Sequence, residues 1–473
     1  RSSDLPSKEN MILKKIARHC VDDTSGLFIT LPEDDLAYQD TFVKACLAAG
    51  INAEVIDPEE AKRMEPSVNP SLIGAVKVPD GSVDPFRLCA SNVFDAKIHG
   101  TKVLVYSEVI EFIKEQDTIK GVKVLDHHTG IVTDYYAPVT VNAGGIWGHH
   151  IAQMAGANIS MFPAKGALLI FAHRVNNVVI NRCRKPANAD ILVPGDTVCV
   201  IGTTSTRVPY EECDHLKVTP DEVDLLLTEG AKLAPCLAET RVLRAYAGVR
   251  PLVSADNDPS GRNISRGIVC LDHETRDGIK GFISITGGKL MTYRLMGEMA
   301  ADAVCKKLGR DAKCVTAGTP LPGSEPGGIE EISKKIWEVP TMVQKASVGR
   351  FGTQAANLDF DGDVKGSLVC ECEEVSVSEV DSAIENLEVN NLVDLRRRTR
   401  FGMGTCQGEL CACRAAGRLA KARKCTAKAR ADLKDFMDER WKGMYPVAWG
   451  ETLRESAYTQ WVYSEVMGLG EEI

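Results

Sequence analysis

Four cysteines near the carboxyl end have the spacing of a metal–sulfur site. Cys370 and Cys372 form a C-x-C pair, and after a long interval Cys406 and Cys411 form a C-x4-C pair. Two close pairs of cysteines in a short module suit a tetrahedral zinc ion or an iron–sulfur cluster. Zinc usually takes C-x2-C pairs, so these spacings favour the cluster. Disulfides are the alternative, which a reducing compartment disfavours.

A second stretch that could do chemistry is 283–294, which reads Ile-Ser-Ile-Thr-Gly-Gly-Lys-Leu-Met-Thr-Tyr-Arg. Its apolar start, the Gly287-Gly288 pair and the helical spacing that follows predict a strand, a tight turn and a helix. Two glycines let the backbone approach a flat ligand, and free N–H groups at a helix start favour an anion. Lys289 and Arg294 add positive charge, so a flavin or a phosphate would fit. An ordinary turn with solvated Lys and Arg is the alternative.

The same pattern occurs earlier, where the predicted strand 138–142 runs into Ala143-Gly144-Gly145 and then a helix that follows Trp147. It is a second place where the backbone could lie against a cofactor. No GxGxxG sequence occurs anywhere in the chain.

A strand is also predicted over 244–252, with Tyr246 and Arg250 beside a glycine. A charged residue inside an apolar strand indicates an anion to bind, with an internal ion pair as the alternative.

The elements that must position these residues belong to a chain of 473 residues, long enough for two or three domains. Its net charge of −9 argues against nucleic-acid binding, and no apolar run has the length of a membrane span. A Pro- and Gly-rich break over 316–328 predicts a domain boundary. Before it, alternation over 74–87 predicts a hairpin that turns at Asp80-Gly81, and 103–142 reads as meandering β structure.

Around the cysteines the sequence predicts helices over 379–387, with Ser378 as N-cap, over 392–399, and from about Cys406 onward. This region is basic although the chain is acidic. A solvated face is the default interpretation, and a docking face for an acidic redox partner is the sharper one. The basic residues are Arg396, Arg397, Arg398, Arg400, Arg414, Arg418, Lys421, Arg423 and Lys424.

Taken together, the motifs over 141–148, 201–204, 247–252 and 286–294 resemble those of the FAD-dependent glycerol-3-phosphate dehydrogenases. The four cysteines, with Gly-Met-Gly-Thr-Cys-Gln-Gly-Glu over 402–409, resemble the bacterioferritin-associated-ferredoxin type of [2Fe–2S] domain. That order of domains is similar to the order found in the anaerobic, quinone-linked branch of the dehydrogenase family.

The resemblance implies an α/β (α+β) fold of the D-amino-acid-oxidase-like kind, followed by a small helical [2Fe–2S] domain. It divides the chain into an FAD- and substrate-binding part over 1–317, a spacer over 318–366, the cluster domain over 367–425 and a helical tail over 426–473. The family begins with a βαβ finger for the ADP half of FAD, and this chain is expected to start after it.

The resemblance also assigns roles to residues. Arg250, Arg266 and Lys289 would clasp the substrate phosphate and act in catalysis. Cys370, Cys372, Cys406 and Cys411 would hold the cluster, with Cys413 as a spare. Residues along FAD would be Val109, Ala143, Gly144, Trp147, Gly287, Gly288, Lys289 and Leu290.

The implied activity is oxidation of sn-glycerol 3-phosphate to dihydroxyacetone phosphate, with hydride transfer to FAD. Electrons would leave through the cluster to two partners, a flavoprotein (B) and a membrane Fe–S protein (C) that reduces quinone. The chain, without a transmembrane segment of its own, would lie at the cytoplasmic face of the inner membrane or in the cytoplasm. The alternatives are a component of a flavin-dependent amine or opine dehydrogenase and a non-catalytic Fe–S scaffold.

Overall fold

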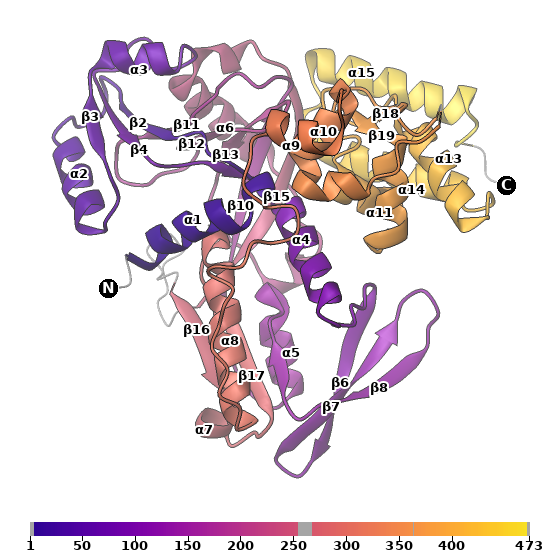
Figure 1. The fold of residues 1–473 in the computed structure, drawn as a ribbon. Coiled ribbons are helices and arrows are strands. Elements are labelled where there is room, and N and C mark those ends of the chain that lie inside the picture. The colour runs from indigo at the N-terminus through magenta and orange to yellow at the C-terminus, as the bar shows by residue number, and fades with distance from the viewer. Residues whose placement is uncertain (1–3, 254–266, 363, 471–473) are drawn as a thin grey trace.

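The computed structural model describes residues 4–253, 267–362 and 364–470 (Figure 1). Its largest sheet has nine strands in the order β14-β10-β13-β12-β11-β2-β4-β3, and β15 pairs with the other edge of β10. The strands are β2 (Gly26–Thr30), β3 (Glu54–Ile56), β4 (Gly74–Val78), β10 (Phe162–Phe171), β11 (Val179–Arg182), β12 (Ile191–Pro194), β13 (Cys199–Gly202), β14 (Thr206–Arg207) and β15 (Val242–Leu252).

The core of this sheet follows from the alternation along β10. Ala167, Leu169 and Phe171 point to one face and are fully buried. The helix α6 (Pro220–Leu233) packs there through residues such as Leu226, and the 3-10 helix η4 (Pro235–Ala238) follows it. The opposite face of β10 therefore remains for a ligand or another domain.

The amino-terminal elements largely follow their local signals. Asp57 caps α3 (Pro58–Met64) and Asp84 caps α4 (Pro85–Ile98), each with Pro at the first helical position. The other elements here are α1 (Asp4–Ile16), η1 (Arg18–Cys20), β1 (Val21–Asp22), α2 (Tyr38–Ala48) and β5 (Ser82–Val83).

The hairpin predicted at Asp80-Gly81 is wrong. β4 pairs with β2 on one edge and β3 on the other, so no edge is left for the strand that follows it. That strand, β5, pairs instead with β1.

A smaller sheet, in the order β16-β17-β9, forms the lower part of the molecule (Figure 1). β9 and β17 run parallel, so their carboxyl ends lie at the same edge. The predicted meander forms a separate three-stranded antiparallel sheet, β6-β7-β8. Bounds are β6 (Ser107–Glu115), β7 (Thr118–Asp126), β8 (Val132–Tyr136), β9 (Thr140–Asn142), η2 (Gly145–Trp147), α5 (Gly148–Met154), η3 (Tyr210–Glu212), β16 (Ile268–Asp272), α7 (His273–Asp277), β17 (Phe282–Gly287), η5 (Leu290–Thr292) and α8 (Tyr293–Lys307).

The remaining residues form a helical part at the upper right of Figure 1. α12 has the predicted bounds, whereas α11 is capped by Ser376 rather than Ser378, because the Ser376 hydroxyl and Glu379 form a capping box. The elements are α9 (Ile329–Ile336), α10 (Met342–Phe351), η6 (Gly352–Asn357), β18 (Leu368–Cys370), β19 (Val375–Ser376), α11 (Val377–Asn386), α12 (Leu392–Thr399), α13 (Ala412–Arg423), α14 (Ala429–Met444), η7 (Tyr445–Val447), α15 (Gly450–Trp461) and the π-helical turn η8 (Val462–Val466).

The end of the chain packs into both parts of the molecule. Phe436 of α14 and Tyr463 of η8 are buried in the same core cluster as Leu395 and Leu419 around the cysteines. Val447 is buried in the core of the large sheet, and Thr452 donates a hydrogen bond to the carbonyl of Val242 at 2.6 Å. The carboxyl-terminal helices thus fasten the cluster domain to the large sheet.

Among the helices in the described part of the chain, none combines the length and apolar composition that crossing a bilayer requires.

Candidate functional site

The glycine turn after β17 has the predicted form. Gly287 and Gly288 have φ of +77° and +71°, a region that side chains other than glycine rarely adopt. The Lys289 N–H donates to the Thr292 hydroxyl at 2.9 Å, which closes the turn before α8. Lys289 and Leu290 are exposed at this point. The turn thus places a backbone and two side chains where a ligand can reach them.

Arg294 does not face that ligand space. Its guanidinium donates to both carboxylate oxygens of Glu9, at 2.6 and 2.8 Å, and also pairs with Glu298. Arg294 and Glu9 are both buried. The interpretation of Arg294 as charge for a ligand is therefore wrong, because its counter-ions come from α1 and α8.

The second glycine turn lies at the same sheet edge. In the parallel pair of β9 and β17, Asn142 is opposite Ser284, so the turns after both strands come together. The Asn142 carboxamide accepts from the Gly144 N–H at 3.1 Å and donates to the Gly148 carbonyl at 2.8 Å. This fixes the backbone that leads into α5.

The exposed side chains of this second turn are Ala143 and Trp147. The Trp147 indole N–H donates to a carboxylate oxygen of Asp214 at 2.9 Å. About half of Trp147 is exposed, at 49 %. A flat cofactor could lie against this ring and against the turn at Gly287-Gly288.

A buried network that sequence reasoning missed supports both turns. The Ser284 hydroxyl accepts from the Asn142 amide at 3.2 Å and contacts His273 Nε2 at 2.8 Å. His273 Nδ1 lies 2.5 Å from Asp277. The pattern of the sequence contains no signal for it, because these polar residues meet only when α7 folds back on the sheet.

Arg250 lies on the ligand-accessible face of β15. Its guanidinium donates to the Thr203 hydroxyl and, at 3.3 Å, to the Thr204 carbonyl. Gly166, on the paired strand β10, makes room for it: a Cβ there would lie 2.6 Å from Arg250 Nη2. These oxygen acceptors hold the guanidinium in place on this face.

A cavity of about 1310 Å³ separates this face from the helical part. Its lining includes Tyr246 of β15, Leu290 of the glycine turn and Cys372 of the cysteine cluster. The cavity therefore connects the two sites that the sequence predicted. Lys289 is next to the lining residue Leu290, Arg250 lies three residues after the lining residue Ala247, and their convergence on one phosphate stays a prediction. Arg266 lies outside the described residues.

Val109 occupies another region. It lies on β6 opposite Val124 of β7, in the meander sheet, whose Phe112 packs in one core cluster with α5. Its predicted place near the adenine of FAD is not tested by these contacts.

The four predicted cluster ligands come together. The Cys411 thiol hydrogen-bonds with those of Cys370 and Cys406, and Cys406 also contacts Cys372. These contacts and backbone N–H groups of Leu410 and Gly408 lower the pKa of Cys406 to about 5, which favours the thiolate that metals bind. Cys411, which donates to two thiols, has its pKa raised.

The thiols contact one another in pairs. Within the described ranges, no three His, Cys, Asp or Glu side chains converge as ligands of a single ion. A [2Fe–2S] cluster divides its four cysteines between two irons, so it does not need such convergence. The cluster loop is tight, since a Cβ on Gly404 would lie 2.5 Å from the Cβ of Cys372.

One detail of this region differs from expectation. α13 begins at Ala412, so Cys411 is its N-cap and Cys406 lies in the preceding turns rather than in the helix. Cys413 points away from the other thiols, with its sulfur 3.7 Å from that of Met467. Its role as the spare cysteine stays a prediction.

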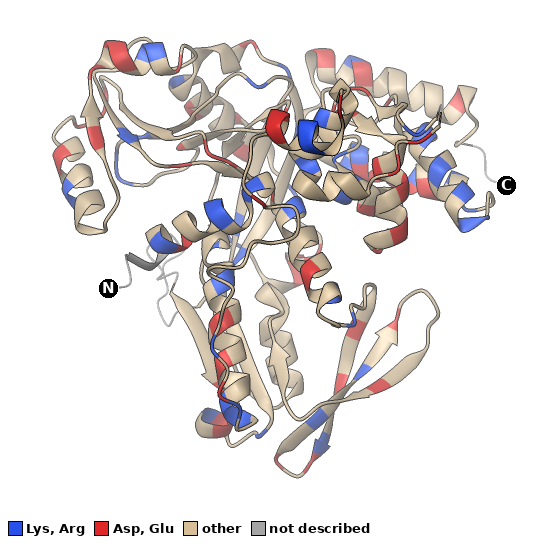
Figure 2. Ribbon diagram, viewed as in Figure 1, with Lys and Arg blue, Asp and Glu red and all other residues tan. Residues whose placement is uncertain are grey.

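Much of the basic region is paired within the helical part, where acidic and basic residues interleave (Figure 2). Arg414 forms two hydrogen bonds of 2.5 Å with Glu371. Arg418 pairs with Asp381 and Arg423 with Asp432. These contacts favour the solvated, ion-paired face over a docking face for an acidic partner.

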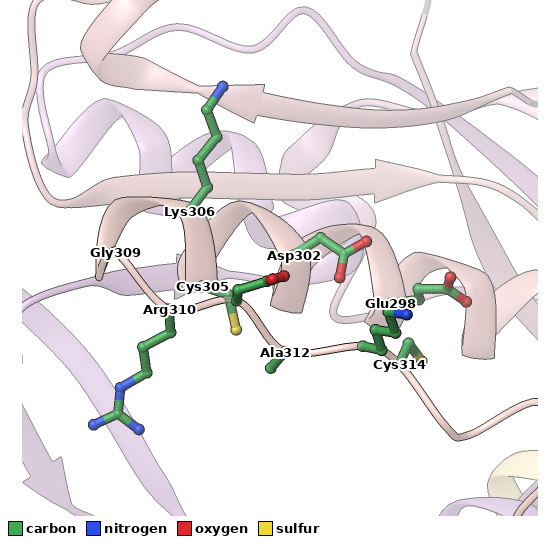
Figure 3. Close-up of a pocket in the computed structure, with 10 residues that line it drawn as sticks. Glu298, Asp302, Cys305, Lys306, Gly309, Arg310, Ala312 and Cys314 are labelled. Carbon is green, nitrogen blue, oxygen red and sulfur yellow. The ribbon is translucent and has the colours of Figure 1, made fainter.

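A smaller cavity, of about 610 Å³, lies beside the end of α8 (Figure 3). Its lining mixes acids, Glu298 and Asp302, with bases, Lys306 and Arg310. It contains none of the predicted site residues.

Comparison with known families agrees with both halves of this arrangement. Residues 10–294 match the family described as FAD dependent oxidoreductase, and residues 368–419 match the BFD-like [2Fe-2S] binding domain. These matches confirm the predicted fold class and the two predicted cofactors, FAD and a [2Fe–2S] cluster. The predicted domain boundaries stay predictions.

Individual proteins are similar over almost the whole chain. It is 60 % identical to the A component of the anaerobic glycerol-3-phosphate dehydrogenase of Escherichia coli over 465 residues, 98 % of this chain and 86 % of that protein. It is 59 % identical to the protein of the same name from Haemophilus influenzae, over 98 % of this chain and 82 % of that protein. The solved FAD complex of glycerol-3-phosphate dehydrogenase from Bacillus halodurans has the same fold, with a TM-score of 0.72 at 21 % identity, over 94 % of this chain and 87 % of that chain.

Proposed function

The chain belongs to the FAD-dependent oxidoreductases and, within them, to the family of the A components of anaerobic glycerol-3-phosphate dehydrogenase, and from this we propose that it oxidises sn-glycerol 3-phosphate to dihydroxyacetone phosphate. The observation that carries the proposal is the identity of 60 % over 98 % of the chain, which includes both cofactor domains.

In the proposed reaction, bound FAD supplies the acceptor for the hydride that leaves C2 of the alcohol. The proton of the hydroxyl group leaves to a base. The chain's own residues must therefore bind a phosphate dianion, favour the alkoxide and exclude water from the reacting carbon.

Arg250 is the residue we assign to alkoxide and phosphate stabilisation. It is held by the oxygen atoms of Thr203 and Thr204, which orient the guanidinium. A preorganised cation of this kind stabilises developing negative charge without reorganising. Lys289, exposed at the glycine turn, would add a second cation, and Arg266 a third.

FAD would lie along the shared edge of β9 and β17. Gly287, Gly288, Lys289 and Leu290 would contact its ring system, and Ala143, Gly144 and Trp147 would lie along the rest of the cofactor. Two adjacent turns at the carboxyl ends of parallel strands support this placement. Val109, on the meander, is proposed near the adenine.

Cys370, Cys372, Cys406 and Cys411 are proposed as the cluster ligands, and the contacts among their thiols support the assignment. Electrons would pass from the flavin across the cavity to this cluster. From there they would pass to the flavoprotein partner (B) and to the membrane Fe–S partner (C) that reduces quinone. Association with the membrane Fe–S partner would hold the chain at the cytoplasmic face of the inner membrane.

The test is a visible spectrum of the purified full-length protein under anoxic conditions. Addition of glycerol 3-phosphate should bleach the flavin absorbance and then reduce the cluster. Arg250→Met should keep both cofactors and slow the bleaching by about a hundredfold or more, as loss of a preorganised charge does. Bleaching by an amine or opine in place of glycerol 3-phosphate would contradict the proposal, and so would cluster absorbance without bound flavin.

A further inference from the structure

Arg244 is a buried cation at the boundary between the large sheet and the cluster domain. It lies on β15 six residues before Arg250 and on the same face, and it is only 7 % exposed. Its guanidinium packs against Gly443 of α14, where a Cβ would collide with it, and Nη1 donates to the Gln407 carboxamide oxygen at 3.4 Å.

Arg396, from α12, approaches the same oxygen atom. Its Nη2 donates to Gln407 Oε1 at 3.0 Å, while its Nε is buried without a hydrogen-bond partner among the described residues. Arg396 lines the cavity, so water in the cavity reaches part of a side chain that protein atoms otherwise enclose. Within the ranges that the structure describes, neither arginine forms a salt bridge with a carboxylate within 4.0 Å.

Two like charges that share one neutral acceptor are costly to the fold when one is buried and the other half-buried. Burial lowers the pKa of both guanidiniums, and the charge of Arg244 lowers that of Arg396 further. The negative charge of Glu439 acts in the opposite direction and raises the pKa of both guanidiniums. Because no carboxylate among the described residues pairs with either guanidinium within 4.0 Å, the pair indicates a further anion nearby.

Gln407 shows where that anion would be. It follows Cys406 directly and is 2 % exposed. Its amide donates to the carbonyl oxygens of Met403 and Gly404, both at 2.9 Å, which turns its own oxygen toward the two arginines. The arginines are therefore held against the cysteine loop.

We propose that Arg244 and Arg396 compensate the negative charge of the [2Fe–2S] cluster and raise its reduction potential, one from each domain. A cluster with four thiolate ligands is anionic and gains a further negative charge when it is reduced, so a nearby buried cation stabilises the reduced form more than the oxidised form. The two residues do not bind the cluster. They make it a better acceptor for electrons from the flavin, and Arg244 does so only while the cluster domain is docked on β15.

This inference rests on the proposed cysteine ligands but not on the proposed substrate. The test is a redox titration of the holoprotein with dithionite and mediators, followed by the electron paramagnetic resonance signal of the reduced cluster. Arg244→Gln and Arg396→Gln should each disfavour cluster reduction by about tenfold, a midpoint about 59 mV lower for one electron. Arg396→Lys, which keeps the charge, should have a midpoint potential close to that of the parent protein.

Arg397→Gln is the matched control, because it removes the same charge from the same helix at an exposed position. A shift as large in this control would overturn the proposal, as would unchanged midpoints in both glutamine variants. If Arg396→Gln fails to assemble the cluster, Arg244→Gln decides the matter, and loss of the cluster from both would assign the residues a structural role instead. A parent protein without any [2Fe–2S] signal would contradict the proposed function itself.

Discussion

At the scale of single residues, the position of Arg250 depends on the absence of a side chain opposite it. Gly166 and Gly248 face each other across β10 and β15, yet only Gly166 lies under the guanidinium. The sequence shows Gly166 merely as one residue of an apolar strand. Its role becomes evident only when β15 pairs with β10 and brings Arg250 across.

Gly166→Ala should therefore impair substrate binding without unfolding the sheet. The new Cβ would lie 2.6 Å from Arg250 Nη2 and 2.9 Å from Nη1, atoms at the end of a flexible side chain that can move away. We expect kcat/KM for glycerol 3-phosphate to fall by about tenfold or more, as small misplacements of a catalytic group do. Steady-state kinetics beside a thermal melt would measure both effects.

Gly248→Ala is the control, since a Cβ at that position has no neighbour within 4 Å. Equal kinetic losses in both variants would show that crowding of Arg250 is not the cause.

At the scale of elements, α1 and α8 are joined by a buried ion pair. Glu9 and Arg294 are separated by 285 residues in the chain and by 2.6 Å in the structure. The hydrogen bonds from Glu9, together with those from Glu298, raise the pKa of Arg294. The pair fixes the helix that follows the glycine turn, so the flavin site depends on an element far away in sequence.

Arg294→Met should destabilise the protein by about 3–5 kcal/mol, because it leaves the Glu9 carboxylate buried and unpaired. Denaturant unfolding would measure the change in free energy. The exposed pair Lys335–Glu331 offers a comparison, for which Lys335→Met should cost less than about 1 kcal/mol. The double variant Glu9→Leu/Arg294→Met should regain part of the loss, and a double variant less stable than Arg294→Met would contradict this account.

His19 fastens three elements and should make their stability depend on pH. Its ring nitrogens lie 3.0 Å from the hydroxyls of Ser324, in the spacer, and Ser91, on α4. Burial, with a smaller contribution from Arg87, lowers the pKa of His19 to about 4. Between about pH 6.5 and 4 the unfolded state binds a proton that the folded state does not, so stability falls as pH falls through this range.

The loss from His19 should reach about 2 kcal/mol at pH 4 after allowance for its partial exposure. Denaturant unfolding of the parent and of His19→Asn at pH 7, 6, 5 and 4 would separate it from the loss that the carboxylates cause. The variant should show the shallower decline. His99→Asn, at an exposed position, should follow the parent, and parallel curves for the parent and His19→Asn would refute the assignment.

At the scale of the whole molecule, the cluster domain is built into the oxidoreductase part rather than attached by a free linker. α14 packs in the core around the cysteines and η7 in the core of the large sheet, and Arg241, beside β15, pairs with Glu455 of α15. The cavity between the two parts extends from Leu290 to Cys372. The residues proposed to hold the two cofactors are therefore held in fixed positions relative to each other.

Cys411→Ser should separate the two activities of the proposed complex. It removes a thiol that contacts two others, so the protein should lose the cluster. The rate of quinone reduction should then fall by about tenfold or more. Reduction of an artificial dye by glycerol 3-phosphate, which takes electrons from the flavin, should persist. Iron content and absorbance would be measured beside both rates.

Cys413→Ser, two residues away, should keep the cluster, because its sulfur faces Met467. Loss of iron in Cys413→Ser, or its retention in Cys411→Ser, would reassign the ligands.

Local signals by themselves determined several features of this protein. Asp57 and Asp84 mark helix starts, the Gly287-Gly288 pair marks a turn, and the helix over 392–399 has the predicted bounds. The spacing of the cysteines indicated a cluster before any fold was known. Such features depend on neighbours within a few positions, which the sequence displays directly.

Only the tertiary structure decided which distant residues meet. The pairing of both edges of β4 removed the predicted hairpin, the contact with Glu9 took Arg294 away from the ligand, and Gln407 brought Arg244 and Arg396 to one point. Each outcome depends on chain segments that close over long separations, where edge pairing, burial and charge must be satisfied at once. No local pattern contains that information, because the partner is chosen by packing.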